Sequence, residues 1–437
     1  MKLSIVGAGA MRTPLLLHGL LQSDLPVSRV DLFDIDEDRL GRLFPVMQAV
    51  AGSVELRRQS DAAAAIRGSQ FVLVSIRVGG MARRARDERV TLEHGILGQE
   101  TVGPVGFFKG LRTVPPVLEY ARMIERLAPQ AYLINFSNPV GIVTQAVTMK
   151  TKARIIGICD TPTELFEEAA GVLGVPSGEC FFDFVGLNHL GWLRQVYHRG
   201  RPQMQHLLAN SQRLYRAPFY SPAFLRQLGL LPTEYCYFYY SPQRALQGML
   251  QAGRTRGAQL EELNARFFED LARAADPLLS YENYLATRNS TYMQSESGCT
   301  PRCNHSTGAL GAELTGYDKI ALSVLRGIHF NLGRLVPLNV PNRGNVPELE
   351  KEDVVEVPCV VDSNGVHPVH VGELPAQVRE LVVGVKQYER LTVRAALSGD
   401  QAEAFHALAR NPLVPNLEVA EALVAKLRCC QSERAAE

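Results

Sequence analysis

The first 160 residues alternate short apolar runs with polar turns and helical stretches, and this alternation restricts the fold more than any other sequence feature. Val, Ile, Leu and Phe fill the apolar runs almost continuously, as expected for strands covered on both faces. Strands that alternate with helices predict a parallel, doubly wound sheet with right-handed crossovers. The expected strands are Lys2–Val6, Arg29–Phe33, Val54–Arg58, Phe71–Ile76, Ala131–Phe136 and Arg154–Cys159.

The pattern changes after about residue 185, where longer helical stretches alternate with fewer strands. The helices expected there are Pro222–Leu230, Gln259–Ala275, Tyr317–Leu332, Leu374–Leu397 and Gln401–Leu408, and the strands are Leu335–Val340, Val354–Val361 and Val366–Val371. We therefore predict an α/β fold in which a Rossmann-type dinucleotide-binding domain, residues 1–185, precedes a C-terminal α+β domain, residues 186–437. The second domain would hold substrate, metal and subunit contacts.

Composition excludes several classes of function. The chain has 46 Lys and Arg against 45 Asp and Glu, so its formal charge of +1 argues against a nucleic-acid partner. The sequence contains no run of about 18 apolar residues, so it predicts no membrane-spanning helix. The eight cysteines are irregularly spaced in a long chain, which favours reduced thiols and a cytoplasmic location over a disulfide framework.

The first predicted strand is followed by a glycine turn, Gly7-Ala8-Gly9, and then by Thr13-Pro14 at the start of a helix. Glycines let the backbone approach a pyrophosphate, and the first amides of the helix attract the anion. Asp34 ends the second strand, where its carboxylate could bind an adenosine ribose and would repel a 2′-phosphate. These positions favour NAD, although a plain turn followed by a solvated acidic loop would look similar.

Polar side chains follow the fourth and fifth predicted strands as well. Arg77 and Arg84 stand where a guanidinium could bind phosphate or carboxylate, or could pair with nearby acidic residues on a solvated helix. Asn135 and Asn138 flank the turn after the fifth strand, where amides can bind sugar hydroxyls or stabilise the turn itself.

Cys159 and Asp160 end the sixth strand, and His189 follows about thirty residues later. A thiolate and an imidazole brought together at a ligand crevice could hold a divalent metal and leave positions open for substrate oxygens. A buried cysteine at a strand end is more often an inert core residue. Tyr235 begins a run of aromatic residues that could be packing, or could supply a phenol as a base.

Taken in order, these motifs resemble glycoside hydrolase family 4, the NAD- and manganese-dependent glycosidases that include the 6-phospho-glucosidases. The resemblance covers nearly the whole chain, and the order and spacing of its pieces make it specific. Besides the motifs above, it rests on Arg77-Val78-Gly79-Gly80, Gly98-Gln99-Glu100-Thr101-Val102-Gly103-Pro104, Asn135-Phe136-Ser137-Asn138-Pro139, Gly157-Ile158-Cys159-Asp160-Thr161-Pro162, Gly186-Leu187-Asn188-His189 and Val355-Glu356-Val357-Pro358-Cys359.

The resemblance implies a role for each candidate residue. Cys159 and His189 would hold manganese, or another divalent metal, and Tyr235 and Asp160 would be the catalytic base and acid. NAD would be bound by Gly7, Gly9, Thr13, Asp34, Arg77 and Asn135. The phosphorylated sugar would be bound by Arg84, Asn138 and Arg256. The family also implies a homodimer or homotetramer.

Two segments point to opposite anomers of the substrate. Asp160 matches the family members specific for α-linked substrates, whereas Gly106–Pro115 looks more like the members specific for β-linked substrates. The longer segment favours a 6-phospho-β-glucosidase. Two departures from the family concern Ala10, which replaces a frequent serine in the glycine turn, and Gly298–His305, which is unlike the family sequence.

The mechanism implied by the family is transient oxidation of the sugar by NAD at carbon 3, elimination of the aglycone and addition of water. Three alternatives stay open. The chain could be a 6-phospho-α-glucosidase, or an NAD-dependent 2-hydroxyacid dehydrogenase that needs no metal and makes stoichiometric NADH. It could also be a sugar-phosphate sensor that kept the fold and lost the chemistry.

Overall fold

A computed structural model describes residues 1–214, 218–298 and 316–434 of the 437-residue chain. Most of the unusual stretch Gly298–His305 lies outside these residues. None of the helices in the described ranges is long and apolar enough to cross a bilayer.

Six parallel strands form the amino-terminal half of one large sheet, in the order β3-β2-β1-β4-β5-β6. This is the classical order of a dinucleotide-binding fold, and it confirms the fold class expected from the sequence. The strands are β1 (Lys2–Val6), β2 (Arg29–Phe33), β3 (Glu55–Arg58), β4 (Phe71–Val74), β5 (Tyr132–Asn135) and β6 (Arg154–Gly157). Each lies within two residues of a predicted strand at either end.

Helices connect these strands, as the doubly wound pattern requires. They are α1 (Thr13–Gln22), α2 (Glu37–Ala51), α3 (Ala62–Ile66), α4 (Gly80–Glu93), α5 (Pro104–Leu127), α6 (Val140–Lys150) and α7 (Thr161–Leu173). The strands they cover are buried: every residue of β4 is at most 3% exposed. This burial explains the continuous apolar runs in the sequence.

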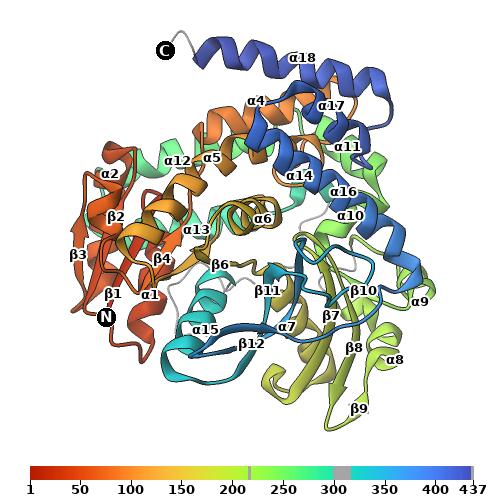
Figure 1. Ribbon diagram of the computed structural model, residues 1–437, viewed down its shortest axis with the longest axis horizontal. Coiled ribbons are helices and arrows are strands. Elements are labelled where there is room, and N and C mark those ends of the chain that lie inside the picture. The colour runs from red at the N-terminus through yellow and green to blue at the C-terminus, as the bar shows by residue number, and fades with distance from the viewer. Residues whose placement is uncertain (215–217, 299–315, 435–437) are drawn as a thin grey trace.

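The carboxyl-terminal strands continue the same sheet, in the order β6-β11-β12-β7-β8-β10, and this continuity was not predicted. Figure 1 shows the parallel strands at the left and the β7–β8 hairpin at the lower right. The strands are β7 (Cys180–Leu187), β8 (Leu190–His198), β9 (Arg201–Pro202), β10 (Leu231–Pro232), β11 (Arg334–Pro341), β12 (Val354–Asp362) and β13 (Gly365–Pro368). Because β7 spans the expected boundary at residue 185, the sheet itself does not break there, and the division into domains stays a prediction.

Four residues in a row tie the two halves of the sheet together. Gly157 of β6 pairs with Asn339 of β11, Asn339 pairs with Glu356 of β12, and Glu356 pairs with Gly186 of β7. Gly157 is necessary at its position, because a Cβ there would lie 2.5 Å from the Thr144 hydroxyl oxygen. The row therefore joins the strand that leads to Cys159 with the hairpin that carries His189.

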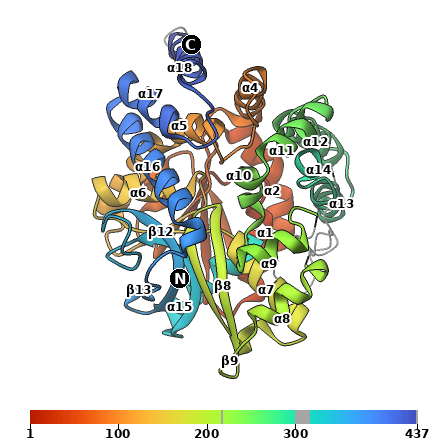
Figure 2. The ribbon, with the colours of Figure 1, turned by 90° about the vertical axis from the view of Figure 1, so that its right-hand side faces the viewer.

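Helices of the second half cover the first half on both sides. They are α8 (Met204–Ala209), α9 (Pro222–Leu228), α10 (Tyr237–Tyr240), α11 (Pro242–Gln251), α12 (Arg256–Leu271), α13 (Pro277–Ser290), α14 (Gln294–Ser297), α15 (Gly316–Phe330), α16 (Ala376–Ser398), α17 (Gln401–Arg410) and α18 (Leu417–Arg434). Figure 2 shows α16 to α18 gathered on one side and α12 to α14 on the other. Helix α12 packs on α4, α13 on α2, α15 on α1, and α16 on α5 and α6.

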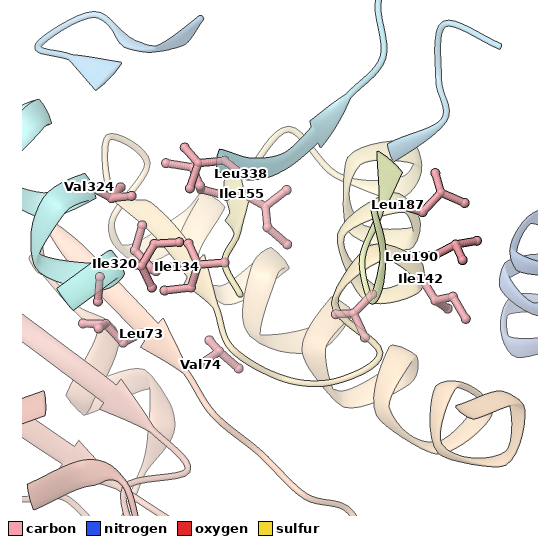
Figure 3. Packing of buried hydrophobic residues seen from close by; sticks show 14 of the residues in the cluster. Leu73, Val74, Ile134, Ile142, Ile155, Leu187, Leu190, Ile320, Val324 and Leu338 are labelled. Carbon is pink, nitrogen blue, oxygen red and sulfur yellow. The ribbon is translucent and has the colours of Figure 1, made fainter. Parts of the chain in front are cut away.

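The apolar core extends across both halves. Figure 3 labels Ile320 of α15, Ile134 of β5, Leu338 of β11 and Ile155 of β6 among the buried side chains. All four side chains belong to a single buried cluster that runs through the sheet. The amino-terminal strands are therefore buried in part by residues that come 150 or more positions later in the chain.

Candidate active site

The loop after β1 turns sharply at Gly7 and leaves no room for a side chain. Gly7 has a φ of +84°, and a Cβ there would lie 2.2 Å from the Ser75 carbonyl oxygen. Thr13 then begins α1, with Pro14 in its first turn. A tight glycine turn that leads into a helix N-terminus is the feature that binds a pyrophosphate in dinucleotide-binding folds.

Asp34 lies against this loop, as expected from its place after β2. Its Oδ2 accepts a hydrogen bond from the Gly9 amide at 2.7 Å, and Arg39 Nε donates to the Gly9 carbonyl oxygen at 2.7 Å. On the other side of the loop, the Tyr281 hydroxyl of α13 donates to the Met11 carbonyl oxygen at 2.6 Å. The second half of the chain therefore contributes directly to this loop.

The two asparagines near the end of β5 lie in different surroundings. Asn135 is buried, and its Oδ1 accepts from the Ser137 amide at 3.0 Å while its Nδ2 donates to the Ser137 carbonyl oxygen at 3.2 Å. Its side chain thus stabilises the turn itself. Asn138 Oδ1 is buried and has no hydrogen-bond partner among the described residues, so it can accept a hydrogen bond from a ligand.

Glu100 joins the two arginines that follow β4. Its carboxylate forms ion pairs with Arg84 at 2.6 Å, with Arg77 and with Lys109. Burial raises the pKa of Glu100, but the three cations outweigh burial and hold this pKa well below its usual value. Burial also lowers the pKa of Lys109 to about 7. The expected cofactor contact Arg77 and the expected substrate contact Arg84 are therefore held by one carboxylate.

His189 lies against Tyr235, and Cys159 lies near it, although the two are far apart in the chain. The imidazole of His189 stacks on the Tyr235 ring with centroids 3.8 Å apart and planes 7° from parallel. Cys159 is close enough that its thiolate would raise the pKa of the Tyr235 phenol. The structure therefore brings the expected metal ligands and the expected base to one place.

Burial keeps both expected ligands uncharged in the absence of a metal. It lowers the pKa of His189 to about 3, so the imidazole is neutral. It raises the pKa of the Cys159 thiol well above its usual value, and the carboxylates of Glu356 and Asp160 add to this effect. A divalent cation would reverse the shift at Cys159, because it favours the thiolate.

Glu356 supplies a further buried carboxyl group at this place. Asn339 Nδ2 donates to its Oε1 at 2.7 Å, while its Oε2 has no hydrogen-bond partner within the described ranges. Burial raises the pKa of Glu356 to about 8, against the hydrogen bond from Asn339 that lowers it. Acidic groups thus lie together here in their uncharged forms, and a bound cation would favour their ionised forms, which fits a site for a metal ion.

The protein does not complete a metal site by itself. Among the residues that the structure describes, no three His, Cys, Asp or Glu side chains are grouped closely enough to hold an ion. Cys159 and His189 would therefore provide only part of the coordination, and oxygens of a bound molecule would provide the rest. Catalytic metal sites keep such open positions.

Tyr235 and Asp160 are each held by a neighbour. Burial raises the pKa of the Tyr235 phenol well above its usual value, and the nearby Glu234 adds to this effect. The Tyr292 hydroxyl donates to the Tyr235 oxygen at 3.1 Å, which favours the phenolate. Asp160 Oδ2 accepts from Arg12 Nη1 at 3.4 Å, directly before the start of α7.

Arg256, at the start of α12, lies in a cluster of guanidinium groups. Burial lowers its pKa to about 10, with attraction by Glu296 opposing this effect and repulsion by Arg288 and Arg84 adding to it. Burial likewise lowers the pKa of Arg288, and Arg12 and Arg84 repel it. Within the described part of the chain, neither Arg256 nor Arg288 forms an ion pair. This surplus of buried positive charge is suited to a phosphate group.

Four residues of this site had no role predicted from the sequence: Glu100, Arg288, Glu356 and Thr101, whose hydroxyl oxygen lies 2.6 Å from His189 Nδ1. Glu356 carries a visible signal, because a glutamate alternates with valines inside a buried strand. Glu100 and Thr101 lie in a segment that the resemblance includes without assigning roles. Arg288 lies on an ordinary polar helix, and nothing in the sequence distinguishes it from a surface arginine.

Comparison with known families agrees with this geometry. Residues 2–175 match the model of the family 4 glycosyl hydrolases, and residues 184–414 match that of the family 4 glycosyl hydrolase C-terminal domain. The chain belongs to glycosyl hydrolase family 4. This membership confirms the resemblance on which the expected site residues depend.

Relatives within the family include enzymes for both anomers. The chain is 31% identical to the "Probable 6-phospho-beta-glucosidase" of Bacillus subtilis, over 97% of this chain and 95% of the relative. A solved 6-phospho-alpha-glucosidase from gut microorganisms, in complex with NAD and glucose-6-phosphate, shares 26% identity over 97% and 96% of the two chains, with a TM-score of 0.83. The 6-phospho-beta-glucosidase of Thermotoga maritima, solved with manganese, NAD+ and glucose-6-phosphate, shares 25% identity over 99% and 98%, with a TM-score of 0.85.

Proposed function

We propose that the protein is an NAD- and manganese-dependent 6-phospho-glucosidase that prefers β-linked substrates. The proposal is carried by three groups of residues: a glycine loop with Asp34, the pair Cys159 and His189, and the buried guanidinium groups of Arg256 and Arg288, which form no ion pair within the described ranges. Each group suits one component of the reaction. They are, in turn, the dinucleotide, the metal and the sugar phosphate.

The cofactor would lie along the loop after β1. Gly7 and Gly9 would admit the pyrophosphate, Thr13 would begin the helix that faces it, and Asp34 would bind the ribose. Arg77 would reach the cofactor from the end of β4. Asn135 would act through the turn that it stabilises, because both ends of its amide are already bonded to Ser137.

Cys159 and His189 would hold the metal, and the residues around them would handle protons. When bound, NAD would accept a hydride from carbon 3 of the sugar, and the metal would polarise the resulting ketone. Tyr235 would then take the proton from carbon 2, with the hydrogen bond from Tyr292 stabilising the phenolate. Asp160 would donate a proton to the departing oxygen.

Arg84, Arg256 and Arg288 would bind the 6-phosphate, and Asn138 Oδ1 would accept a hydrogen bond from a sugar hydroxyl. Binding energy from the phosphate would hold the sugar in a fixed orientation toward the cofactor. The preference for β-linked substrates is supported by segment Gly106–Pro115 and by the Bacillus subtilis relative, which is the most similar of the three reported above.

The test is an assay of chromogenic α- and β-glucosides, each with and without the 6-phosphate, in the presence of NAD, manganese and a reductant. We expect cleavage of the phosphorylated β-glucoside, with no accumulation of NADH because the hydride returns to the product. Faster cleavage of the α-glucoside would reverse the assigned preference. Stoichiometric NADH would identify a dehydrogenase, and binding without turnover would identify a sensor.

Replacing Cys159 tests the metal ligand directly. We expect Cys159→Ser to abolish activity and to weaken manganese binding without unfolding the protein, because serine keeps the size of the side chain and loses the thiolate. Cys180→Ser is the matched control, because Cys180 is half-buried at the start of β7 and away from the site. Full activity of Cys159→Ser, or of the unaltered protein without metal and NAD, would contradict the scheme.

We also propose a cytoplasmic location, from the thiol content, and a homodimer or homotetramer, from the family. Analytical ultracentrifugation of the full chain tests the oligomeric state. A monomer at all concentrations would contradict the second proposal.

A further inference from the structure

His189 is held in an unusual backbone conformation in the turn between β7 and β8. Its φ of 62° lies in the left-handed region, which costs a residue with a side chain about 1 kcal/mol or more. The residue is 5% exposed, and one face of its imidazole is covered by the Tyr235 ring. The ring is therefore fixed in place, and its remaining freedom is the position of the proton on its two nitrogens.

The side chain of Gln99 provides a reference point for assigning that proton. Its Oε1 accepts hydrogen bonds from the backbone amides of Thr101 and Val102, each at 2.7 Å. Two N–H donors identify this atom as the amide oxygen, because the alternative amide orientation would place an NH2 group against two other donors. The atom can accept a hydrogen bond and cannot donate one.

The same oxygen lies 3.1 Å from the Thr101 hydroxyl. Since Gln99 Oε1 cannot donate, the single hydroxyl hydrogen of Thr101 points to Gln99. Thr101 Oγ1 is then left as an acceptor toward its other neighbour, His189 Nδ1, at 2.6 Å. The direction of the whole relay follows: Nδ1 of His189 donates to Thr101, and Thr101 donates to Gln99.

We propose that Thr101 is a positioning residue that selects the His189 tautomer with the proton on Nδ1 and the lone pair on Nε2. This inference rests on the proposed function in one respect, that His189 is a metal ligand. The relay would present Nε2 to the metal and prevent the imidazole from offering the other nitrogen. Partners of this kind orient histidine ligands in metalloenzymes and contribute about 10- to 100-fold to metal affinity.

Two substitutions at Thr101 separate this role from simple packing. Thr101→Val keeps the shape of the side chain and removes the acceptor, whereas Thr101→Ser keeps the hydroxyl. Both leave Gln99 and the backbone amides that it binds in place. A packing role would tolerate valine at least as well as serine, because valine matches the volume of threonine.

The first measurement is the tautomer in the metal-free protein, read from the 15N chemical shifts of the imidazole after selective labelling of the histidines. His189→Gln identifies the His189 signals among those of the ten histidines. We expect the proton on Nδ1 in the unaltered protein and in Thr101→Ser, and a redistribution toward Nε2 in Thr101→Val. A proton on Nε2 in the unaltered protein, or no redistribution in Thr101→Val, would overturn the inference.

The second measurement is manganese affinity, read from the electron paramagnetic resonance signal of the free ion. Thr101→Val should weaken binding by about 10- to 100-fold and Thr101→Ser by less than about threefold. The affinity for NAD should be the same in all three proteins. Equal manganese affinity in the unaltered protein and Thr101→Val would overturn the inference. If the unaltered protein bound no manganese, the proposed metal role would fail, and the tautomer measurement would still decide the relay.

Discussion

His189, Cys159 and Glu356 are buried together, and burial moves the pKa of each one toward its uncharged form. The guanidinium groups of Arg256 and Arg288 are buried as well and remain charged without an ionic partner in the described ranges. Substitutions of single residues in such surroundings have large effects on activity or stability, because few neighbours compensate each charge.

Replacing Arg288 should weaken binding of the substrate phosphate and leave the chemical steps intact. We expect Arg288→Gln to raise KM for a 6-phosphorylated glucoside by about 10- to 100-fold, the value of a charged hydrogen bond, with a smaller change in kcat. Steady-state kinetics provide the measurement. The control is Arg266→Gln, an exposed arginine of α12 that pairs with Glu262 on the surface. A fall in kcat at unchanged KM would argue against a phosphate contact.

Glu356 should make the metal-free protein less stable as pH rises. Its pKa is raised from 4.5 to about 8, so its contribution to folding is present below the usual pKa and is lost as pH rises toward 8. One proton changes the free energy of unfolding by about 1.4 kcal/mol per pH unit in this window. Chemical denaturation should therefore show that the free energy of unfolding falls less between about pH 5.5 and pH 7.5 in Glu356→Gln than in the unaltered protein. Equal losses in both proteins would show that the carboxyl group is already ionised.

The positions at strand ends could be predicted from the sequence because parallel strands end at one edge of a sheet. That rule located Gly7, Asp34 and Cys159 without any knowledge of tertiary contacts. It could not locate Arg288, which reaches the site from a helix more than a hundred residues later. It also could not assign Asn135 to the turn, because an amide before a turn suits a ligand and the backbone equally.

At the scale of elements, the sheet depends on the close contact between β6 and β11. The sequence predicted both strands and not their pairing, because a single register contact between distant segments leaves no periodic signal. The same holds for the β7–β8 hairpin, whose residues were noticed only as a histidine motif. Glycine at position 157 is the local feature that permits the contact.

Gly157→Ala should separate these strands. The new Cβ would lie 2.5 Å from Thr144 Oγ1, 2.6 Å from Val140 Cγ1 and 2.9 Å from Asn339 Cβ. We expect a loss of about 1–3 kcal/mol in the free energy of unfolding, the usual cost of overpacking, measured by chemical denaturation.

Gly171→Ala provides the matched control on the neighbouring helix α7. A Cβ at Gly171 would meet no atom within 4 Å, and alanine favours a helix, so this variant should gain about 0.5–1 kcal/mol. A neutral effect of Gly157→Ala would mean that β6 and β11 can move apart without cost.

At the scale of the whole molecule, the two halves share one sheet and one core. Helix α15 packs on α1, α13 on α2 and α16 on α5, so the amino-terminal half exposes apolar surface if the rest is removed. The sequence suggested two domains because its periodicity changes near residue 185. Periodicity describes elements, however, and does not report which of them pack together.

The full chain should consequently unfold in one transition. Trp192, the one tryptophan of the sequence, is buried in β8, so its fluorescence reports on the second half alone. Far-UV circular dichroism reports on the helices of both halves. We expect the two signals to coincide in denaturant, and we expect residues 1–175 to be insoluble when expressed alone. Separate midpoints, or a soluble and cooperative fragment, would contradict a shared core.

The segment between Gly98 and Gly103 assigns a different partner to each of three adjacent side chains. Gln99 accepts a hydrogen bond from the Thr101 backbone amide, Glu100 forms ion pairs and Thr101 is hydrogen-bonded to His189. Surface loops usually tolerate an added or deleted amino acid. Here a one-residue change would shift every later side chain onto the wrong neighbour, and Gly98 leaves no room for a side chain, because a Cβ there would lie 2.7 Å from the Glu88 carbonyl oxygen. In any redesign of this enzyme, the segment from Gly98 to Gly103 should therefore keep its length.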